Sequence, residues 1–396
     1  MSSSLPETAV PVATVVAGVV GVLVAGVVGW LFAAPPWLMW LMLMGLSGLP
    51  MWCLEFVRHS PLRPGDSETG TQPTSRNALG SFTVVGLFVA SIELQLLFDG
   101  PQVAGLAAIK LPLVLALGAC AVMLLLVRDR ETAKVGGCVM ALLRGEWPSR
   151  DLAQAFLGWC VKAFFLPLMI AWSYGWLVNA RADAHSWKDG YKLYLMVMAG
   201  LYAIDTAFGT IGYMSTSRRL GAHIRSVDST LLGWGSALVC YPPLNTWVIG
   251  VWLAYKSSKD WHDWFADVPW LAVAWGALIV LFTAVYVYAT VVFGPRFSNL
   301  TNRGIITIGP YRWSKHPAYI SKNASWWLIS VPFLSSAGVA EAVSHSAALL
   351  GLNGIYWLRA WTEERHLRAD PVYVQYADWI ERNGLLARVK KVLSCG

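Results

Sequence analysis

The sequence predicts an all-α, polytopic integral membrane protein with about ten transmembrane helices. Of its 396 residues, 56% are hydrophobic and 13% are charged, whereas an average soluble domain carries about 25% charged residues. The chain also contains 22 tryptophans, a residue that concentrates where a bilayer meets water. Too few polar side chains are present to cover a soluble globule of this size, and the same composition excludes a disordered chain and a secreted disulfide scaffold.

The apolar runs give the expected helices in order. A bilayer core about 30 Å thick requires a helix of about 20 apolar residues. Ten such runs, bounded by charge, Pro or Gly, lie at residues 9–32, 35–57, 78–98, 103–127, 152–179, 191–213, 229–254, 269–294, 317–338 and 343–360. The first run begins almost at Val10 and has no basic segment ahead of it, so we expect a retained span rather than a cleaved signal peptide.

The loop charges predict the side of the membrane that each loop faces, because Lys and Arg concentrate in cytoplasmic loops. If the N-terminus is cytoplasmic, the segments on that side carry 22 Lys and Arg residues, with Arg359 at the end of the last run counted among them. The loops on the other side carry four, namely Arg181, Lys188, Lys256 and Lys259. This split predicts a multi-pass protein with both termini in the cytoplasm, in the inner membrane if the source is bacterial.

Charge and cysteine usage exclude two kinds of partner. The net charge is +7, but the cations lie in short loops between apolar runs rather than along one helix face, so no nucleic-acid partner is expected. The six cysteines form no C-x-x-C pair, and most lie inside or beside apolar runs. We therefore expect neither a metal site nor a disulfide framework.

Some ionisable residues fall within the expected spans, where charges are costly and often functional. They are Glu93, Lys110, Lys162, Asp205 and Lys322. Each lies near the end of a span or could pair with another helix, so snorkelling or structural pairing is the favoured interpretation for each of them.

The first chemically distinctive segment covers residues 304–320. It brings two cations, a histidine and three aromatic residues to the start of an expected span. Pro317 suits the first turn of a helix, which puts His316 at the helix start beside free backbone N–H groups. An anionic group can bind in such a position. The alternative is a cytoplasmic anchor with an interfacial aromatic belt.

The second segment, residues 359–367, follows the last expected span. On a helix, Arg359 and Glu363 are four residues apart and share a face, whereas Glu364 is turned by about 100°. Only one of the two glutamates can therefore face a given pocket. The alternative is an ordinary salt bridge on a solvated helix face.

Together the two segments resemble a known family. The pattern G-P-Y-R-x-x-K-H-P-x-Y, then two spans, R-x-x-x-E-E-x-x-L and P-x-Y-x-x-Y resembles the isoprenylcysteine carboxyl methyltransferases and related membrane phospholipid methyltransferases, over about residues 280–395. The family usually has Arg where this chain has Lys315, and Gly near the position of Lys322. The resemblance implies two parts, an accessory transmembrane helical bundle (1–254) and a methyltransferase-like catalytic membrane domain (255–396).

The resemblance further implies an enzyme that uses S-adenosylmethionine and a lipophilic or lipid-anchored acceptor that enters from the bilayer. By analogy, the cofactor-binding candidates are Tyr311, Trp313, Lys315, His316, Tyr319 and Glu363, with Tyr311 and Trp313 closing over the cofactor. The catalytic candidates are Arg359, Glu363 and Glu364, of which Arg359 and Glu364 are candidates for contact with the acceptor.

Two other functions are compatible with the sequence. Membrane reductases of the sterol-reductase type share a related G-P-Y-R-x-x-x-H-P-x-Y pattern and use NADPH. A transporter would account for the charges within the spans, but it would predict inverted repeats or paired broken helices, which the sequence lacks. Whether a methyl acceptor is a carboxylate, a phosphate or an amine stays open.

Overall fold

The computed structural model describes residues 4–59, 74–97, 104–127, 129–184, 188–257 and 259–394. Within these ranges the only strands are β1 (Ser226–Val227) and β2 (Thr301–Asn302), which pair antiparallel. The all-α class predicted from the sequence is therefore confirmed.

The helices are α1 (Val12–Leu31), α2 (Pro36–His59), α3 (Thr74–Leu96), α4 (Ala104–Val127), α5 (Arg130–Leu143), α6 (Arg150–Ala184), α7 (Gly190–Met214), α8 (Leu231–Leu238), α9 (Leu244–Trp247), η1 (Val248–Trp252), α10 (Trp261–Phe265), α11 (Pro269–Val291), η2 (Gly294–Arg296), η3 (Gly309–Arg312), α12 (Pro317–Ser330), α13 (Val339–Leu367), α14 (Pro371–Asn383) and α15 (Leu385–Ser394).

Six helices of the described ranges are long and apolar enough to cross a membrane: α1, α2, α3, α6, α7 and α11. Each agrees with an expected span to within a few residues. Many of their large apolar side chains are exposed, as is usual for helices that face lipid. The expected count of ten spans is not supported: three of the other four runs do not form a long apolar helix, and of α4, in the run 103–127, only Ile109–Ala119 counts as an apolar helix among the described residues.

The run 229–254 is not one helix. It divides into α8, α9 and the π-helical turn η1, with a turn at Pro242 and Pro243 between α8 and α9. A proline inside a helix removes a backbone hydrogen bond and clashes with the preceding turn. Hydropathy alone does not register this break.

The last two runs also depart from the expectation. Helix α12 stops at Ser330, because Val331 adopts a left-handed conformation (φ 36°) and a proline follows it. The run 343–360 lies within α13, whose serines, histidine, asparagine and Arg359 make it too polar to count as an apolar span. In the run 103–127, α4 forms, but only Ile109–Ala119 qualifies as a shorter apolar helix.

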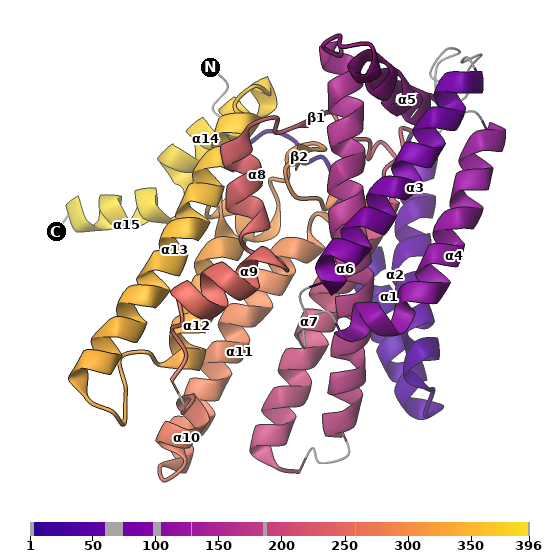
Figure 1. Cartoon of the computed structure of the whole chain (residues 1–396). Coiled ribbons are helices and arrows are strands. Elements are labelled where there is room, and N and C mark those ends of the chain that lie inside the picture. The colour runs from indigo at the N-terminus through magenta and orange to yellow at the C-terminus, as the bar shows by residue number, and fades with distance from the viewer. Residues whose placement is uncertain are drawn as a thin grey trace.

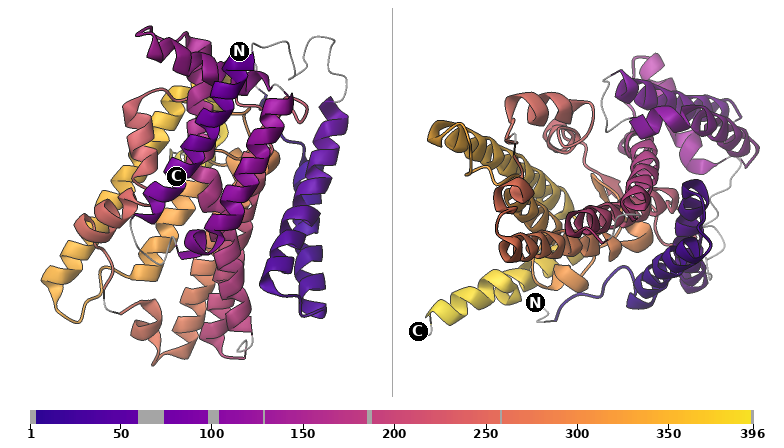
Figure 2. Two further views of the ribbon diagram at one scale, coloured as in Figure 1. Left: turned by 45° about the vertical axis from the view of Figure 1, so that its right-hand side comes forward. Right: turned by 90° about the horizontal axis from the view of Figure 1, so that it is seen from below.

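The helices are arranged around α6 and α7, which pack along each other in the centre of the molecule (Figure 1). Helices α1 and α2 form a hairpin on one flank, and α3, α4 and α5 pack on one another and on α6. Seen from below, α11, α12 and α13 lie on the other side of α7, and α15 projects away from the body (Figure 2).

Polar loops gather at one end of the molecule, the upper end in Figure 1, together with β1, β2 and α14. The N-terminal segment also lies there. The Ala9 N–H donates to the Ile305 carbonyl (2.8 Å), and the Thr307 hydroxyl donates to the Pro6 carbonyl (2.9 Å). Leu5 packs on the apolar cluster of Ile305 and α14. The N-terminal segment and α14 are therefore held at the same end.

The segment from β1 to Tyr255 packs on the C-terminal helices. The Arg365 guanidinium donates to the Thr230 hydroxyl (2.6 Å), and the Ser236 and Thr362 hydroxyls are 3.2 Å apart. Tyr255 belongs to the same core cluster as residues of α13. Residues immediately before position 255 thus form one packed unit with those that follow it.

Candidate functional site

The first motif segment forms the entry to α12. Gly309 has φ +58°, a conformation that glycine adopts without a steric cost, and it turns the chain into η3. His316 then occupies the position before the first helical residue, and Pro317 is that residue, as the sequence predicts. The backbone N–H of His316 donates to the Ser314 hydroxyl (3.2 Å). This bond fixes the backbone at His316, which lies between the polar loops and the helix.

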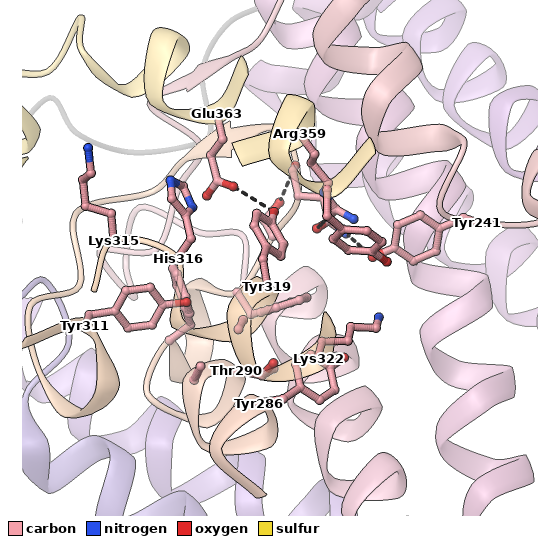
Figure 3. Close-up of a pocket in the computed structure, with 17 residues that line it drawn as sticks. Tyr241, Tyr286, Thr290, Tyr311, Lys315, His316, Tyr319, Lys322, Arg359 and Glu363 are labelled. Atoms are coloured by element: carbon pink, nitrogen blue, oxygen red, sulfur yellow. Dashed lines mark hydrogen bonds between the residues drawn. The ribbon is translucent and has the colours of Figure 1, made fainter. Parts of the chain in front are cut away.

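The second motif segment meets the first through three hydrogen bonds. Glu364 accepts one from the Lys315 ammonium (2.7 Å) and lies 2.8 Å from Nε2 of His316. Glu363 accepts a hydrogen bond from the Tyr319 hydroxyl (2.8 Å; Figure 3). The His316 and Tyr319 rings are parallel, with centroids 5.6 Å apart. The two glutamates contact different partners, as their 100° separation on the helix requires.

The electrostatics of Glu364 follow from these contacts. Burial alone would raise the pKa of this carboxyl, but the hydrogen bonds from His316 and Lys315 outweigh burial and lower the pKa to about 2. The carboxylate is therefore charged at any physiological pH. A charged Glu364 keeps both of its partners in place.

Arg359 is buried, with 8% of its surface exposed. Its guanidinium donates to Oδ1 of Asn299 (2.6 Å) and lies 5.3–6.0 Å from the ring centres of Tyr241, Tyr319 and Tyr356. No ion pair joins Arg359 to the glutamate one turn later in the described part of the chain. The geometry is that of a cation enclosed by aromatic rings, not of a solvated helix face.

Three small adjoining cavities lie between these segments, and all three are lined by Ser298 and Glu363. The inner cavity (about 90 Å³) extends toward α11, where its lining includes Tyr286, Thr290 and Lys322 (Figure 3). The side cavity (about 50 Å³) extends toward α8 and His366. The loop cavity (about 60 Å³) lies among the residues 296–306, α14 and the end of α13.

The predicted site residues separate into two groups. Six of them line one or more of the cavities: Tyr311, Lys315, His316, Tyr319, Arg359 and Glu363. Glu364 lines none of the three cavities, but it contacts Lys315 and His316, which do line them. Trp313 also lies outside them; it is 48% exposed and stacks under the guanidinium of Arg388 at 4.6 Å. It does not close over the cavities.

Several lining residues have no signal in the sequence motifs. Tyr241 falls in a run that reads as a span, and Ser298 and Asn299 lie in the loop between α11 and η3. Only the fold brings them to the two motif segments. Lys322, suspect as a charge within a span, lines the inner cavity with its ammonium 5.0 Å from the Tyr286 ring centre.

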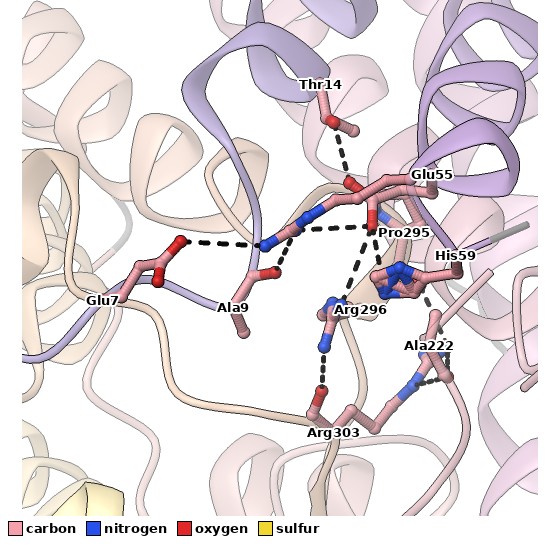
Figure 4. A network of polar contacts seen from close by, with 10 residues as sticks. Glu7, Ala9, Thr14, Glu55, His59, Ala222, Pro295, Arg296 and Arg303 are labelled. Atoms are coloured by element: carbon pink, nitrogen blue, oxygen red, sulfur yellow. Dashed lines mark hydrogen bonds and ion pairs between the residues drawn. The ribbon is translucent and has the colours of Figure 1, made fainter. Parts of the chain in front are cut away.

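The loop after α11 is fastened to the N-terminal hairpin by a buried carboxylate (Figure 4). Glu55 of α2 is 1% exposed and accepts a hydrogen bond from the Thr14 hydroxyl of α1 (2.8 Å). Its second oxygen lies 3.7 Å from Arg296, 3.8 Å from Arg58 and 4.0 Å from His59. Arg296 is the link between this cluster and the loop cavity, which it also lines.

Arg303 fixes the other end of the same loop. This side chain is 3% exposed, and its guanidinium donates to the carbonyls of Ala222, Gly212, Phe297 and Pro295. All its donor nitrogens are in use. The loop lies directly on α7, because a Cβ at Gly212 would be 2.5 Å from the Phe297 oxygen.

No cluster of three or more His, Cys, Asp or Glu side chains suited to a metal ion occurs in the described ranges. Comparisons of the chain with protein-family models, with curated proteins and with solved structures found no match. The family resemblance of the two motif segments therefore stays a prediction.

Proposed function

We propose that this chain is an integral membrane methyltransferase that transfers a methyl group from S-adenosylmethionine to a lipophilic acceptor at the cytosolic interface. The observation that carries the proposal is the direct contact between the two motif segments. They are more than 40 residues apart in sequence, yet Lys315, His316 and Tyr319 bond to Glu363 and Glu364. Six of the eight residues that the family resemblance singles out line the cavities between them.

The lining of the cavities suits a cofactor that carries both an ammonium and a carboxylate. Glu363 offers a carboxylate, and Lys315, His316 and Arg359 offer cationic or N–H groups. In the loop cavity, buried polar atoms of Arg296, Thr301 and Tyr373 have no hydrogen-bond partner. The three cavities together hold about 200 Å³, less than a typical ligand pocket of about 300–1,000 Å³, so a cofactor would occupy all three around Glu363 and widen them.

The residues would act by binding and alignment. S-adenosylmethionine supplies a methyl group from a sulfonium centre, which becomes a neutral thioether. The acceptor attacks the methyl carbon in line with the bond to sulfur, and the positive charge of the sulfonium is lost as that bond breaks. The protein therefore mainly orients the two partners and excludes water. An acidic acceptor needs no base and would be held by Arg359. An amine acceptor must lose a proton, for which Glu363 or His316 is the nearest candidate.

The membrane setting belongs to the same proposal. We assign the end that holds β1, β2, the N-terminal segment and α14 to the cytosol, because the predicted cation-rich loops gather there (Figure 1). The aromatic inner cavity then extends from that face toward the bilayer, from which the acceptor would enter.

The test is incubation of the purified protein with labelled S-adenosylmethionine and a membrane lipid extract, followed by identification of the labelled product. Glu363→Gln should reduce labelling at least 100-fold, because one essential charged contact contributes about 3 kcal/mol to the transition state. Glu381→Gln is the control, since Glu381 is 58% exposed and lines none of the three cavities. Binding of NADPH without binding of S-adenosylmethionine would favour the reductase and refute the proposal.

A further inference from the structure

Three residues that line the loop cavity each have a buried polar atom without a hydrogen-bond partner in the described part of the chain. Nε of Arg296, Oγ1 of Thr301 and Oη of Tyr373 are all buried and have no hydrogen-bond partner. Arg296 and Tyr373 are 5% and 3% exposed. An unpaired buried polar group costs about 1–3 kcal/mol, so three of them around one cavity point to a ligand that completes them.

The chemistry of these atoms selects the ligand. A guanidinium N–H can only donate, and both hydroxyls can donate as well. Burial, the main effect, lowers the pKa of Arg296 to about 10, so the side chain still carries its charge at neutral pH. Three donors, one of them cationic, are suited to an oxyanion such as a carboxylate.

The neighbouring cations Arg303 and Lys315 are not available to bind an oxyanion in the loop cavity. Arg303 lines the same cavity, but its donors are committed to backbone carbonyls. Lys315 is paired with Glu364 at 2.7 Å. Arg296 donates one N–H to the Arg303 carbonyl (3.0 Å) and lies 3.7 Å from Glu55, but its Nε has no partner in the described part of the chain. It is therefore the cation best suited to a ligand in this cavity.

A carboxylate of the protein completes the pattern. Glu363 lines the loop cavity together with the three unpaired donors, and it would attract an ammonium. A cavity with donors on one part of its wall and a carboxylate on another is complementary to an α-amino acid group, whose ammonium and carboxylate are attached to the same carbon atom.

We propose that the loop cavity binds the amino-acid end of the cofactor, with its carboxylate on Arg296, Thr301 and Tyr373 and its ammonium on Glu363. This inference rests on the proposed function. It assigns binding roles to Arg296 and Thr301, which lie outside the two motif segments. It also separates the cofactor carboxylate from His316, which is engaged by Glu364.

The test compares two probes by calorimetry on detergent-solubilised protein. S-adenosylhomocysteine has the amino-acid group, and 5′-methylthioadenosine lacks it. Tyr373→Phe and Thr301→Val, which remove one hydroxyl each, should weaken S-adenosylhomocysteine about tenfold, as expected for one hydrogen bond to a charged group, and leave 5′-methylthioadenosine unchanged. Tyr288→Phe is the control, because Tyr288 is 49% exposed and lines none of the three cavities.

The outcomes separate the two proposals. If the unmodified protein binds neither probe, the proposed function is wrong. If it binds both, but the variants weaken both equally or weaken neither, the methyltransferase proposal stands and the amino-acid subsite is wrong. A raised KM for an anionic acceptor with unchanged S-adenosylhomocysteine binding would assign the oxyanion to the acceptor and overturn the inference.

Discussion

Two carboxylates fasten the segment between α11 and α12, and they do so differently. Glu364 of α13 contacts Lys315 and His316 at 2.7 and 2.8 Å, and its side chain is 18% exposed. Glu55 of α2 is 1% exposed, yet its contact with Arg296 is 3.7 Å long. The more accessible carboxylate thus makes the closer contacts with its basic partners, and the more buried one makes the longer contacts with the basic side chains around it.

We call the Glu364 contact closed, because its carboxylate oxygens are hydrogen-bonded to both partners, and the Glu55 contact open, because Arg296 keeps a donor without a partner. Glu364 uses its oxygens fully and fixes two side chains in one geometry. Glu55 compensates the charge of Arg296 without consuming all its donors, because Nε of Arg296 has no partner. A buried cation can therefore be held in place and still retain capacity for a ligand. Burial alone does not indicate how firmly a carboxylate holds its partner.

The largest expected effect is a loss of stability in acid that depends on Glu364. A pKa lowered from about 4.3 in an unfolded chain to about 2 in the folded protein is worth about 3 kcal/mol. Because the folded pKa is the lower one, this stability is present above pH 4.3 and disappears as the pH falls toward 2. Unfolding midpoints measured between pH 6 and pH 3 should decrease.

Glu364→Gln should remove most of this dependence, because the amide does not titrate. A variant whose pH profile matches that of the unmodified protein would show that other carboxyl groups cause the acid sensitivity. The closed contact at Glu364 would then contribute no more to stability in acid than other carboxyl groups do.

A smaller effect is expected at the open contact. Glu55→Gln removes the charge that faces Arg296 and should cost about 2 kcal/mol, within the range for an uncompensated buried group. The matched control is Glu93→Gln, because Glu93 is 50% exposed and pairs with Lys110 of α4 rather than with the loop. Thermal unfolding in detergent measures both. Equal losses would mean that Glu55 has no particular relation to the loop.

The smallest effect is expected at Glu381, which lies 3.6 Å from Lys315 and is 58% exposed. An exposed ion pair contributes about 0–1 kcal/mol, so Glu381→Gln should change the unfolding free energy by less than about 0.5 kcal/mol. A loss as large as that of Glu364→Gln would show that proximity to Lys315, not hydrogen bonding, determines the contribution.

The sequence predicted the long apolar helices well because length and hydropathy decide them. The runs 35–57 and 191–213, for example, agree with α2 and α7 to within two residues. It failed where local backbone chemistry intervenes, as at Pro242 and Pro243 within the run 229–254. The left-handed Val331, which ends α12, likewise leaves no trace in a hydropathy profile.

The candidate site was predictable only in part. Residues of the two motif segments, such as His316 and Glu363, could be named because they are close together in each segment. Their cavity partners could not: Arg296 and Thr301 reach the site through the course of one loop, and Tyr241 through the break between α8 and α9. Trp313 was named from its position in the motif, but its ring turns toward Arg388.

The contacts of the N-terminal segment have a consequence for biosynthesis. The bond from the Thr307 hydroxyl to the Pro6 carbonyl joins residues 301 positions apart, and Ala9 binds the same loop at Ile305. Residues 6–9 must therefore wait for about 300 further residues to be synthesised before they find these partners, since long-range contacts form only after the intervening chain exists. The walls around the loop cavity include Tyr373 and Tyr376, so they are complete only after these residues have been synthesised as well.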